Sequence, residues 1–294
     1  MSTLYIVGTP IGNLEDVSMR ALRILGEVDF ILCEDTRVTG KLLGHYKINT
    51  PMISYHQHSD ENKTNYILGL LREGKDLAIV ADAGTPGISD PGGKLIQAVI
   101  EKLNVETQDF ASLRGNNFKT GTPHLGVTPV KIEAVPGPSA VTAALSISGI
   151  PTDKFVFMGF PPHKKGRQTF LRKVIASEYP VVLYESKYRI IKLLEELDRI
   201  NKDIRKKAEA EENSQITNYG LRITNQTRKS KFQKDKKDKK EEKSKLKEIT
   251  SVVVCRELSK MHETVYRGEI KTIIEKIKQS QNDQKGEFVV IIGK

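Results

Sequence analysis

Three short segments rich in glycine, proline and small hydroxyl residues hold the groups best suited to ligand chemistry. They are GTPIGNLED at 8–16, DAGTPGISDPGG at 82–93 and PGPSA at 136–140. Such residues form tight turns with exposed backbone N–H and C=O groups, which can hold the polar part of a small ligand. Ser139 can also cap the helix that follows it and point N–H groups toward a carboxylate. Each segment alone is equally typical of an ordinary turn or helix cap.

Two common nucleotide-binding patterns are missing from the sequence. Neither GxGxxG nor GxxxxGK[ST] occurs in it. This disfavours a Rossmann dehydrogenase and a P-loop NTPase, since both need glycines at those spacings to cradle phosphates.

Apolar, β-branched runs alternate with amphipathic segments along the chain, and each glycine-rich segment follows such a run. The run LAIVA is apolar on both faces, which is typical of a strand covered by helices on both sides. The alternation predicts parallel α/β units, in which ligands bind beyond the carboxyl ends of the strands. The predicted strands are 4–7, 30–33, 52–55, 77–82, 130–135, 155–160, 181–186, 251–258, 263–269 and 287–293. Helices are predicted near 16–26, 36–46, 61–73, 93–103, 166–177, 187–200 and 270–280.

The length of 294 residues fits two medium domains, which we place at 1–133 and 134–294. The segment at about 104–128 loses periodicity and is predicted to be a loop insertion in the first domain. The segment at about 206–248 is so charged and poor in apolar residues that we predict a flexible insertion in the second. A solvated tether and an arm that contacts nucleic-acid phosphates both fit it.

Most of the net positive charge lies in one short segment of the chain. The chain carries +10, but 228–247 alone has eleven Lys or Arg against four Asp or Glu, which leaves +3 elsewhere. Overall charge is therefore weak evidence for a polyanionic partner.

The sequence also indicates the cellular compartment and the role of the two cysteines. No apolar run approaches the ~18 residues of a membrane span, and the N-terminus has no secretion signal pattern, so we predict a cytoplasmic protein without membrane contact. Cys33 and Cys255 lie in apolar runs and are predicted to be inert core thiols rather than redox or metal groups.

Taken together, six segments carry a specific resemblance. LYIVGTPIGNLEDVSMRAL, EDTRVTGKLL, DAGTPGISDPG, VPGPSAVTAAL, LYES and RELSKMHE occur in one order. They closely resemble the ribosomal small subunit methyltransferase I family, part of the tetrapyrrole methylase superfamily. The resemblance covers nearly all of the chain outside the two insertions.

The resemblance implies a fold of two α/β domains of the tetrapyrrole methylase type, with the cofactor in the cleft between them, and a homodimer. It implies transfer of a methyl group from S-adenosyl-L-methionine to the ribose 2′-hydroxyl of a decoding-site cytidine of 16S rRNA, within the 30S subunit. That nucleotide is cytidine 1402 in the standard rRNA numbering. By similarity the C-terminal strand lies near the adenine, and the cofactor is contacted by Pro10, Asp82, Ala83, Gly84, Thr85, Gly87, Ile88, Ser139, Ala140 and Tyr184.

A ribose hydroxyl is a weak nucleophile, so some group must accept its proton or stabilise developing negative charge. The candidates are Glu34, Asp35, Arg37, Glu185, Arg256, Glu257, Lys260 and Glu263. Our hypothesis for the proton-handling group is Asp35 or Lys260, with Arg37 and Glu257 as catalytic neighbours. An ordinary Asp35–Arg37 ion pair fits equally well. Lys260 would need a depressed pKa to act as a base, and as a cation it could hold phosphate or alkoxide.

The HKKGR segment offers Lys164, Lys165 and Arg167 as RNA contacts, although a solvated loop fits it equally well. His56 and His58 could face the same way on a strand, but no Cys or carboxylate cluster completes a site, so no metal is predicted.

Two other functions remain open. One is methylation of a small substrate within the superfamily, in the corrinoid or diphthamide pathway. The other is a noncatalytic RNA-binding assembly factor.

Overall fold

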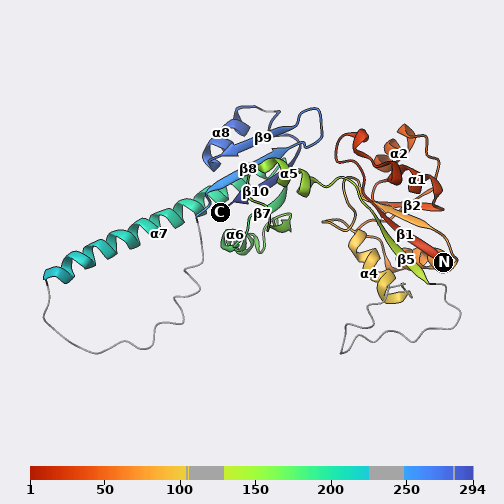
Figure 1. The fold of residues 1–294 in the computed structure, drawn as a ribbon, viewed down its shortest axis with the longest axis horizontal. Helices are drawn as coiled ribbons and strands as arrows, with labels where there is room; N and C mark the ends of the chain where they lie inside the picture. Colours follow the sequence, from red (N-terminus) through yellow and green to blue (C-terminus); the bar gives the residue numbers. More distant parts are fainter. Residues whose placement is uncertain (104, 106–128, 225–247, 281, 294) are drawn as a thin grey trace. The chain divides into compact units, whose positions relative to one another are not determined.

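The computed structural model contains two compact units, residues 1–140 and 141–294. It describes all residues except 104, 106–128, 225–247, 281 and 294, and for 211–224 it describes the backbone alone. Most of the predicted 104–128 insertion, and 225–247 of the second one, therefore lie outside the described residues. Each unit has its own sheet and core (Figure 1).

The sheet of unit 1 is parallel throughout. Its strand order is β3-β2-β4-β1-β5, and every pairing is parallel. The carboxyl ends of all these strands therefore lie at one edge. The strands are β1 (Ser2–Val7), β2 (Phe30–Cys33), β3 (Met52–Ser54), β4 (Leu77–Val80) and β5 (Val130–Val135).

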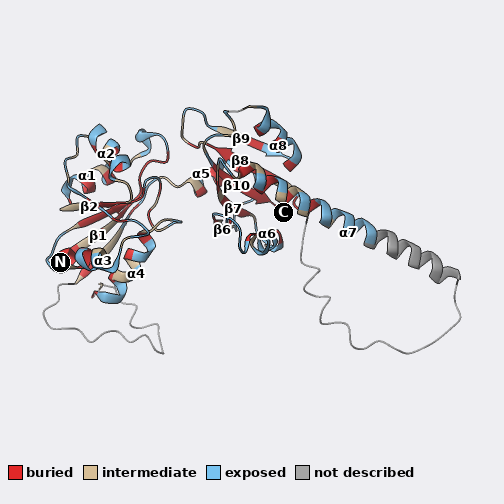
Figure 2. Cartoon of the chain, turned by 180° about the vertical axis from the view of Figure 1, so that it is seen from behind, coloured by how far each residue is buried: buried red, intermediate tan, exposed pale blue. Residues whose placement is uncertain are grey.

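Helices cover both faces of this sheet because its central strands are apolar on both sides. In β4, Leu77 and Ile79 pack with α3 (Glu61–Arg72) and α4 (Gly92–Lys102). Ala78 and Val80 pack on the other face with α1 (Met19–Glu27) and α2 (Thr36–His45). Figure 2 shows buried residues along the central strands of this sheet.

Side-chain caps fix where these helices begin. Ser18 accepts a hydrogen bond from Ala21 N, Asp35 from Arg37 N and Asp60 from Lys63 N. Each cap satisfies an N–H group that has no partner within its helix. A short 3-10 helix (Leu14–Asp16) precedes α1.

The sheet of unit 2 is mixed, with order β6-β7-β10-β8-β9. Only β6 and β7 pair in parallel, and the other pairings are antiparallel. Its strands are β6 (Val156–Gly159), β7 (Val181–Ser186), β8 (Ser251–Arg256), β9 (Thr264–Gly268) and β10 (Glu287–Gly293).

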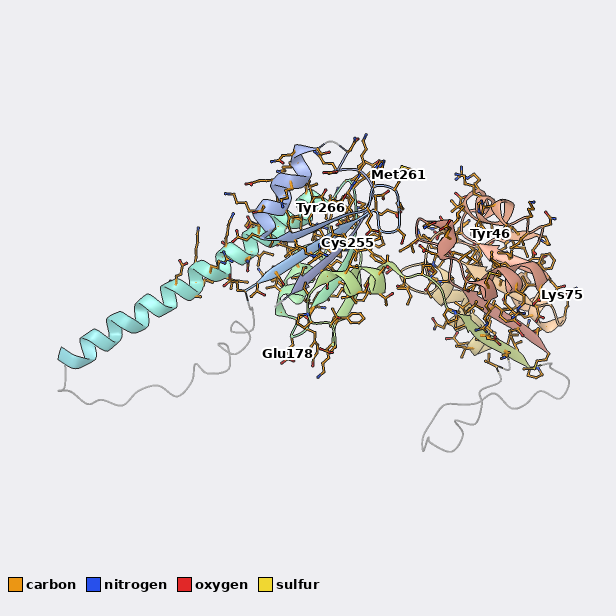
Figure 3. All side chains as sticks on the ribbon, turned by 45° about the horizontal axis from the view of Figure 1, so that its top comes forward. Tyr46, Lys75, Glu178, Cys255, Met261 and Tyr266 are labelled. Atoms are coloured by element: carbon orange, nitrogen blue, oxygen red, sulfur yellow. The ribbon has the colours of Figure 1, made fainter. Side chains whose placement is uncertain are left out.

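One face of the second sheet is covered by α6 (Arg167–Ala176), α7 (Ile190–Thr224) and α8 (Ile270–Gln279). The helix α5 (Ala140–Ser148) lies by β8 and β10 (Figure 1), where Arg267 of β9 donates to the carbonyl of Ile147. Cys255 is buried in this sheet (Figure 3) and Cys33 in the first. Burial raises the pKa of Cys33, and that of Cys255 to about 11, so both thiols stay protonated at neutral pH.

The prediction of a flexible insertion at 206–248 is wrong for residues 206–224, which are helical. The helix predicted to end near Ile200 continues to Thr224. The prediction treated low apolar content as a barrier to order, but a helix satisfies its own backbone groups without a core. Alanine, lysine and glutamate have high helix propensity, and Arg205 and Glu209 stand at i,i+4 spacing.

No helix among the described residues is long and apolar enough to cross a membrane.

A buried asparagine joins α7 to the start of β8. Asn201 accepts a hydrogen bond from Ile249 N at 2.8 Å and donates to Ile249 O at 3.3 Å. We expect Asn201→Ala to lower the free energy of unfolding by about 2 kcal/mol in urea titrations, because two buried backbone groups lose their partners. The control is its exposed neighbour, Lys202→Ala, which breaks only a surface ion pair with Asp198 and should change stability by less than about 0.5 kcal/mol. Equal losses in the two variants would contradict the assignment.

Candidate functional site

Four loops meet at the carboxyl edge of the parallel sheet in unit 1. They follow β1, β2, β4 and β5, which are mutual neighbours in the order β2-β4-β1-β5. Three of them are the glycine-rich segments of the sequence, and the fourth begins with Glu34 and Asp35. The topology therefore gathers segments more than 120 residues apart in sequence at one edge.

Two glycines allow the first and third loops to touch. A Cβ on Gly137 would lie 2.6 Å from Gly8 O, and a Cβ on Gly8 would lie 2.8 Å from Gly137 Cα. Real Cβ atoms do not approach so closely, so only glycine fits at either position. Gly8 N also donates to Val135 O at 3.1 Å, which continues the β1–β5 pairing into the loops.

Backbone hydrogen bonds tie the second loop to the other two. Thr9 N donates to Gly84 O at 2.9 Å, and Gly84 N donates to Thr9 O at 3.1 Å. Thr85 Oγ1 donates to Pro138 O at 3.2 Å. The three loops therefore form one backbone framework, which we call the loop cradle (8–10, 82–88 and 136–140).

Asp90 fixes the far part of the second loop. One of its oxygens accepts hydrogen bonds from Gly87 N and Gly92 N, each at 2.8 Å. Gly84 and Gly87 have φ angles of 84° and 89°, which L side chains rarely adopt. Asp90 is not among the site residues predicted from the sequence, although Asp-Pro ahead of a helix is a recognisable turn signal.

Nine of the ten predicted cofactor residues lie in the loop cradle. Pro10 and Gly84 are buried, Thr85, Gly87, Ser139 and Ala140 are half-buried, and Asp82, Ala83 and Ile88 are exposed. The tenth, Tyr184, lies in unit 2 on β7. Its ring contacts Phe157 edge to face at 4.9 Å and Phe160 at 5.4 Å between centroids.

The EDTR residues start α2 beside the cradle. Asp35 caps the helix and pairs with Arg37, whose Nη2 lies 2.7 Å from Asp35 Oδ2. The Arg37 hydrogen bonds lower the pKa of Asp35 to about 2. Asp35 N also donates to Asp82 Oδ1 at 3.1 Å. The ion pair predicted as the alternative role for Asp35 is therefore present.

The pKa values of two neighbouring carboxylates are raised rather than lowered. Burial, followed by the charges of Asp82 and Asp90, raises the pKa of Glu34. Burial also raises the pKa of Asp82, against the hydrogen bond from Asp35 N. Glu34 is therefore a stronger base than Asp35 in this unit.

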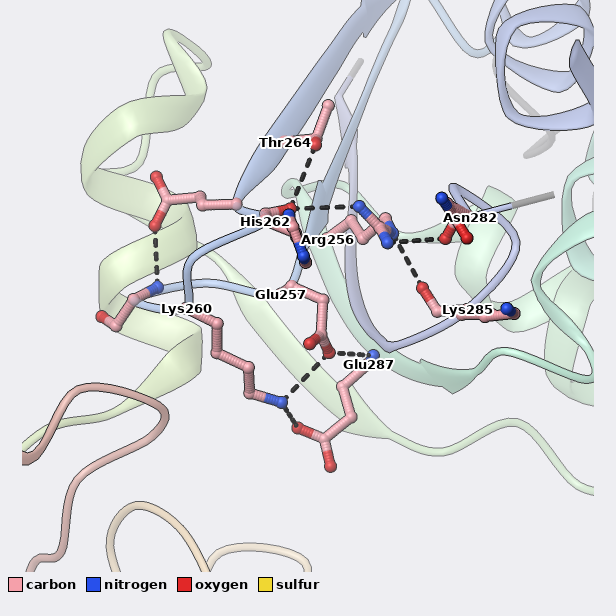
Figure 4. Close-up of polar contacts among 10 residues, drawn as sticks. Arg256, Glu257, Lys260, His262, Thr264, Asn282, Lys285 and Glu287 are labelled. Atoms are coloured by element: carbon pink, nitrogen blue, oxygen red, sulfur yellow. Dashed lines mark hydrogen bonds and ion pairs between the residues drawn. The ribbon is translucent and has the colours of Figure 1, made fainter. Parts of the chain in front are cut away.

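In unit 2, Arg256 has a structural role. It is buried and donates to three carbonyls, Lys285 O at 2.7 Å, His262 O at 3.0 Å and Asn282 O at 2.6 Å (Figure 4). These bonds occupy its guanidinium and hold the β8–β9 loop against the turn before β10. The main role of Arg256 is therefore positioning.

Lys260 and Glu257 form a tight group with Glu287 in Figure 4. Lys260 Nζ lies 3.0 Å from Glu257 Oε1 and 2.9 Å from Glu287 Oε2. Burial alone would lower the pKa of Lys260, but the hydrogen bonds that Lys260 donates to Glu287 and Glu257 outweigh burial and raise the pKa. For Glu257, burial raises the pKa, and the Glu287 N and Lys260 hydrogen bonds bring it below its usual value. Lys260 is therefore a cation at neutral pH and not a base.

The tip of this loop presents an apolar side chain to the outside. Glu257 and Ser259 have positive φ angles of 51° and 61°, and Glu263 accepts a hydrogen bond from Ser259 N. Met261 at its tip is almost fully exposed (Figure 3). Glu287 had no signal in the sequence, since only the β8–β10 pairing brings it to Lys260.

The structure corrects the predicted RNA contact at Arg167. Arg167 is buried, with Nε 2.7 Å from Glu196 Oε2 and Nη1 3.8 Å from Glu185 Oε2. Its place in a basic run suggested exposure, but it occupies the first position of α6, and its side chain turns into the core of unit 2. Lys164 and Lys165 are exposed. Glu185 is buried between Arg167 and Arg189, which excludes it from contact with a substrate hydroxyl.

His56 and His58 lie outside the sheet, in the turn after β3. His58 N donates to His56 Nδ1 at 3.2 Å, so that ring nitrogen is already used within the turn.

Comparison with known proteins decides the family. The model of the Tetrapyrrole (Corrin/Porphyrin) Methylases matches residues 3–108 and 124–274. The chain belongs to the tetrapyrrole methylase family. Within it, the chain belongs to the ribosomal RNA small subunit methyltransferase I family, as its similarity to curated members of that family shows.

Several curated relatives share the name Ribosomal RNA small subunit methyltransferase I. The one from Hydrogenobaculum sp. (strain Y04AAS1) is 35% identical over 99% of this chain and 95% of its own length. Those from Mycoplasmopsis pulmonis (strain UAB CTIP) and Escherichia coli O157:H7 are 33% and 32% identical and are covered over 97% and 77% of their lengths.

Solved structures show the same fold. A cobalt precorrin-4 methyltransferase of cobalamin biosynthesis superposes with a TM-score of 0.55 at 16% identity, covering 99% of this chain and 94% of that one. A uroporphyrin-III-C-methyltransferase from Thermus thermophilus gives 0.53 at 16% identity, covering 100% and 94%. The predicted fold class, two α/β domains of the tetrapyrrole methylase type, is confirmed.

The glycine contact in this methylase can be tested directly. We expect Gly137→Ala to destabilise unit 1 by about 1–3 kcal/mol in urea unfolding, because its Cβ meets Gly8 backbone atoms that cannot rotate away. The control is Gly69→Ala within α3, where an added Cβ meets nothing within 4 Å and should be neutral or stabilising. A Gly137→Ala protein as stable as the unsubstituted one would show that the loops yield freely.

Proposed function

We propose that the protein methylates a ribose 2′-hydroxyl of small-subunit ribosomal RNA, using S-adenosyl-L-methionine. The observation that carries the proposal is similarity over nearly the whole chain to proteins named for small-subunit rRNA methylation. The proposed target is the decoding-site cytidine of 16S rRNA within the 30S subunit. We also propose that it is a homodimer, as the resemblance implied, and that it is cytoplasmic, as the sequence predicted.

The loop cradle fits the proposed cofactor by its chemistry. S-adenosyl-L-methionine has a carboxylate, an ammonium group and a sulfonium, all flanked by apolar carbons. Several backbone groups of residues 82–88 are used within the loops, namely the N–H and C=O of Gly84 and the N–H of Gly87 and Ile88. The other backbone groups of this segment suit the amino-acid part, and the exposed Asp82 carboxylate suits a cation. Ile88 is an exposed apolar side chain in the same loop. We propose that these residues, together with Pro10, Ser139, Ala140 and Tyr184, bind the cofactor.

When bound, the cofactor supplies a methyl group on positively charged sulfur, and the protein must align the hydroxyl with it and exclude water. The rigid cradle suits alignment because its loops are joined by backbone hydrogen bonds. We propose that a carboxylate at the start of α2, either Asp35 or Glu34, accepts the hydroxyl proton. We assign Lys260, which is cationic, to hold a phosphate or the developing negative charge, with Glu257 orienting it.

The decisive experiment follows a labelled methyl group. The protein is incubated with labelled S-adenosyl-L-methionine and one of three substrates, namely 30S subunits, naked 16S rRNA or a corrinoid precursor. We expect label on a ribose of the rRNA, mapped by nuclease digestion and mass spectrometry. Label on the corrinoid alone would favour the small-substrate alternative. If calorimetry shows cofactor binding but no methyl group is transferred to any substrate, the proposed activity is disfavoured. If the protein does not bind the cofactor at all, the noncatalytic assembly factor is favoured.

The proton acceptor is tested by Asp35→Asn, which keeps the helix cap because asparagine caps as well as aspartate. We expect kcat to fall about 10²- to 10⁴-fold while cofactor affinity is unchanged, since the substitution removes the carboxylate that accepts the proton, together with its ion pair to Arg37. Glu34→Gln is the matched variant. If it alone lowers kcat, the role passes to Glu34.

The pH profile separates the two carboxylates. Asp35 stays ionised down to about pH 2, so its low pKa leaves kcat flat between pH 5 and 8. Glu34, with a raised pKa, would instead make kcat rise with pH above the usual glutamate range.

A further inference from the structure

An exposed group of basic and aromatic side chains lies where β6 and β7 end. These strands are parallel neighbours, so their carboxyl ends share one edge of the second sheet. Phe160 and the exposed His163, Lys164 and Lys165 follow β6, and Lys187 and Tyr188 follow β7. We call this group the β6–β7 edge surface.

Tyr188 is the most unusual member of the surface. It is 84% exposed, so its ring contributes little to the core of unit 2. Lys187 Nζ lies 5.0 Å from the centroid of the ring, a cation–π contact that also places a positive charge beside it. Phe160, half exposed, is a second ring on the same edge, and it contacts Tyr184.

Buried charges hold the two segments of this surface in place. Arg189 Nη2 lies 2.9 Å from Glu185 Oε1, and Arg189 Nη1 donates to Pro161 O at 3.3 Å. Arg167 Nη1 donates to Pro162 O at 3.1 Å while its Nε pairs with Glu196. The chain before Lys164 and the turn around Tyr188 are therefore anchored to the same buried carboxylate, Glu185.

Such anchoring matters because an exposed surface binds more tightly when its groups are already placed. The turn carrying Tyr188 is closed by Arg189 N donating to Ser186 O at 3.0 Å. Ser186 N in turn donates to Glu185 Oε1 at 2.8 Å. These hydrogen bonds hold the backbone of the surface in place, while its outer side chains are exposed.

We propose that the β6–β7 edge surface binds single-stranded RNA, with Tyr188 stacking on an unpaired base and Lys164, Lys165 and Lys187 contacting phosphates. An exposed ring can stack only on a base that is free of its helix, and alternating rings and cations are the usual means of holding unpaired nucleotides. The inference rests on the proposed function for the identity of the polyanion. It adds to that function an assignment of stacking to Tyr188 and of a positioning role to Arg167 and Arg189.

The test measures binding of a fluorescein-labelled single-stranded RNA oligonucleotide to the full chain by fluorescence anisotropy. We expect Tyr188→Ala to raise Kd about tenfold and Tyr188→Phe to stay within about twofold, since the aromatic face is kept. Thermal unfolding should be unchanged in both, because the ring is exposed. Binding of the same sequence as a duplex should not respond to Tyr188→Ala.

The chain provides a matched control at the opposite edge of the same sheet. Lys154 and Tyr179 precede β6 and β7 and form the same kind of contact, with Lys154 Nζ 5.5 Å from the ring centroid. Tyr179→Ala should leave Kd unchanged. The double variant Lys164→Gln/Lys165→Gln should flatten the dependence of log K on log salt by about 0.7 per lost phosphate contact, whereas Tyr188→Ala should not change that slope.

Three results of the RNA-binding measurements would overturn the proposal. They are a Tyr188→Ala Kd within twofold of the unsubstituted protein, an equal loss in Tyr179→Ala, and no single-stranded RNA binding by the unsubstituted protein. A change in oligomeric state in Tyr188→Ala at unaltered RNA affinity would also overturn it and assign the surface to contact between copies. The proposed function is judged separately, by label on the ribose, so the two ideas can fail independently.

Discussion

Gly8 and Gly137 lie with their backbones in direct contact, and the arrangement of the loop cradle depends on that contact. The absence of a Cβ at both positions lets the loops after β1 and β5 approach each other. The Thr9–Gly84 backbone pair then brings in the loop after β4. Rigidity of this kind costs little at the moment of binding, because the backbone groups are already oriented before a ligand arrives.

Unit 2 uses buried charge for a comparable purpose. Arg256, Arg167 and Arg189 donate hydrogen bonds to backbone carbonyls, and Arg167 and Arg189 also pair with carboxylates of neighbouring elements. A buried ion pair adds little net stability, because desolvation of the charges offsets their attraction. What these groups provide is position, since each one fixes a loop that secondary structure does not hold.

The two candidate proton-handling groups differ in what their surroundings permit. Two carboxylates hold Lys260 as a cation, so it can stabilise negative charge but does not accept a proton at neutral pH. Asp35 is ionised at neutral pH but is a weak base because of Arg37. Glu34, in a more buried and more acidic setting, is a stronger base than Asp35. The local electrostatics therefore favour proton transfer at the start of α2 over transfer at Lys260.

By itself the sequence determined the local elements. Apolar periodicity located β2, β7 and most helices to within a few residues, because burial of one face or two leaves a repeating signal in the chain. The order of the short motifs determined the family, and glycine-rich turns marked the loops of the cradle.

Only the tertiary structure decided which side chains are available for chemistry. Arg167 and Lys164 stand in one basic run, yet α6 turns the first into the core and leaves the second exposed. The β8–β10 pairing brings Glu287 to Lys260 from 27 positions away. The hydrogen bond to Glu287 then helps to raise the pKa of Lys260, which burial alone would lower. The continuation of α7 past Ile200 was missed because composition predicts whether a core can form, whereas a helix supplies its own hydrogen bonds. Such outcomes depend on contacts between distant segments, and local sequence patterns carry no record of those contacts.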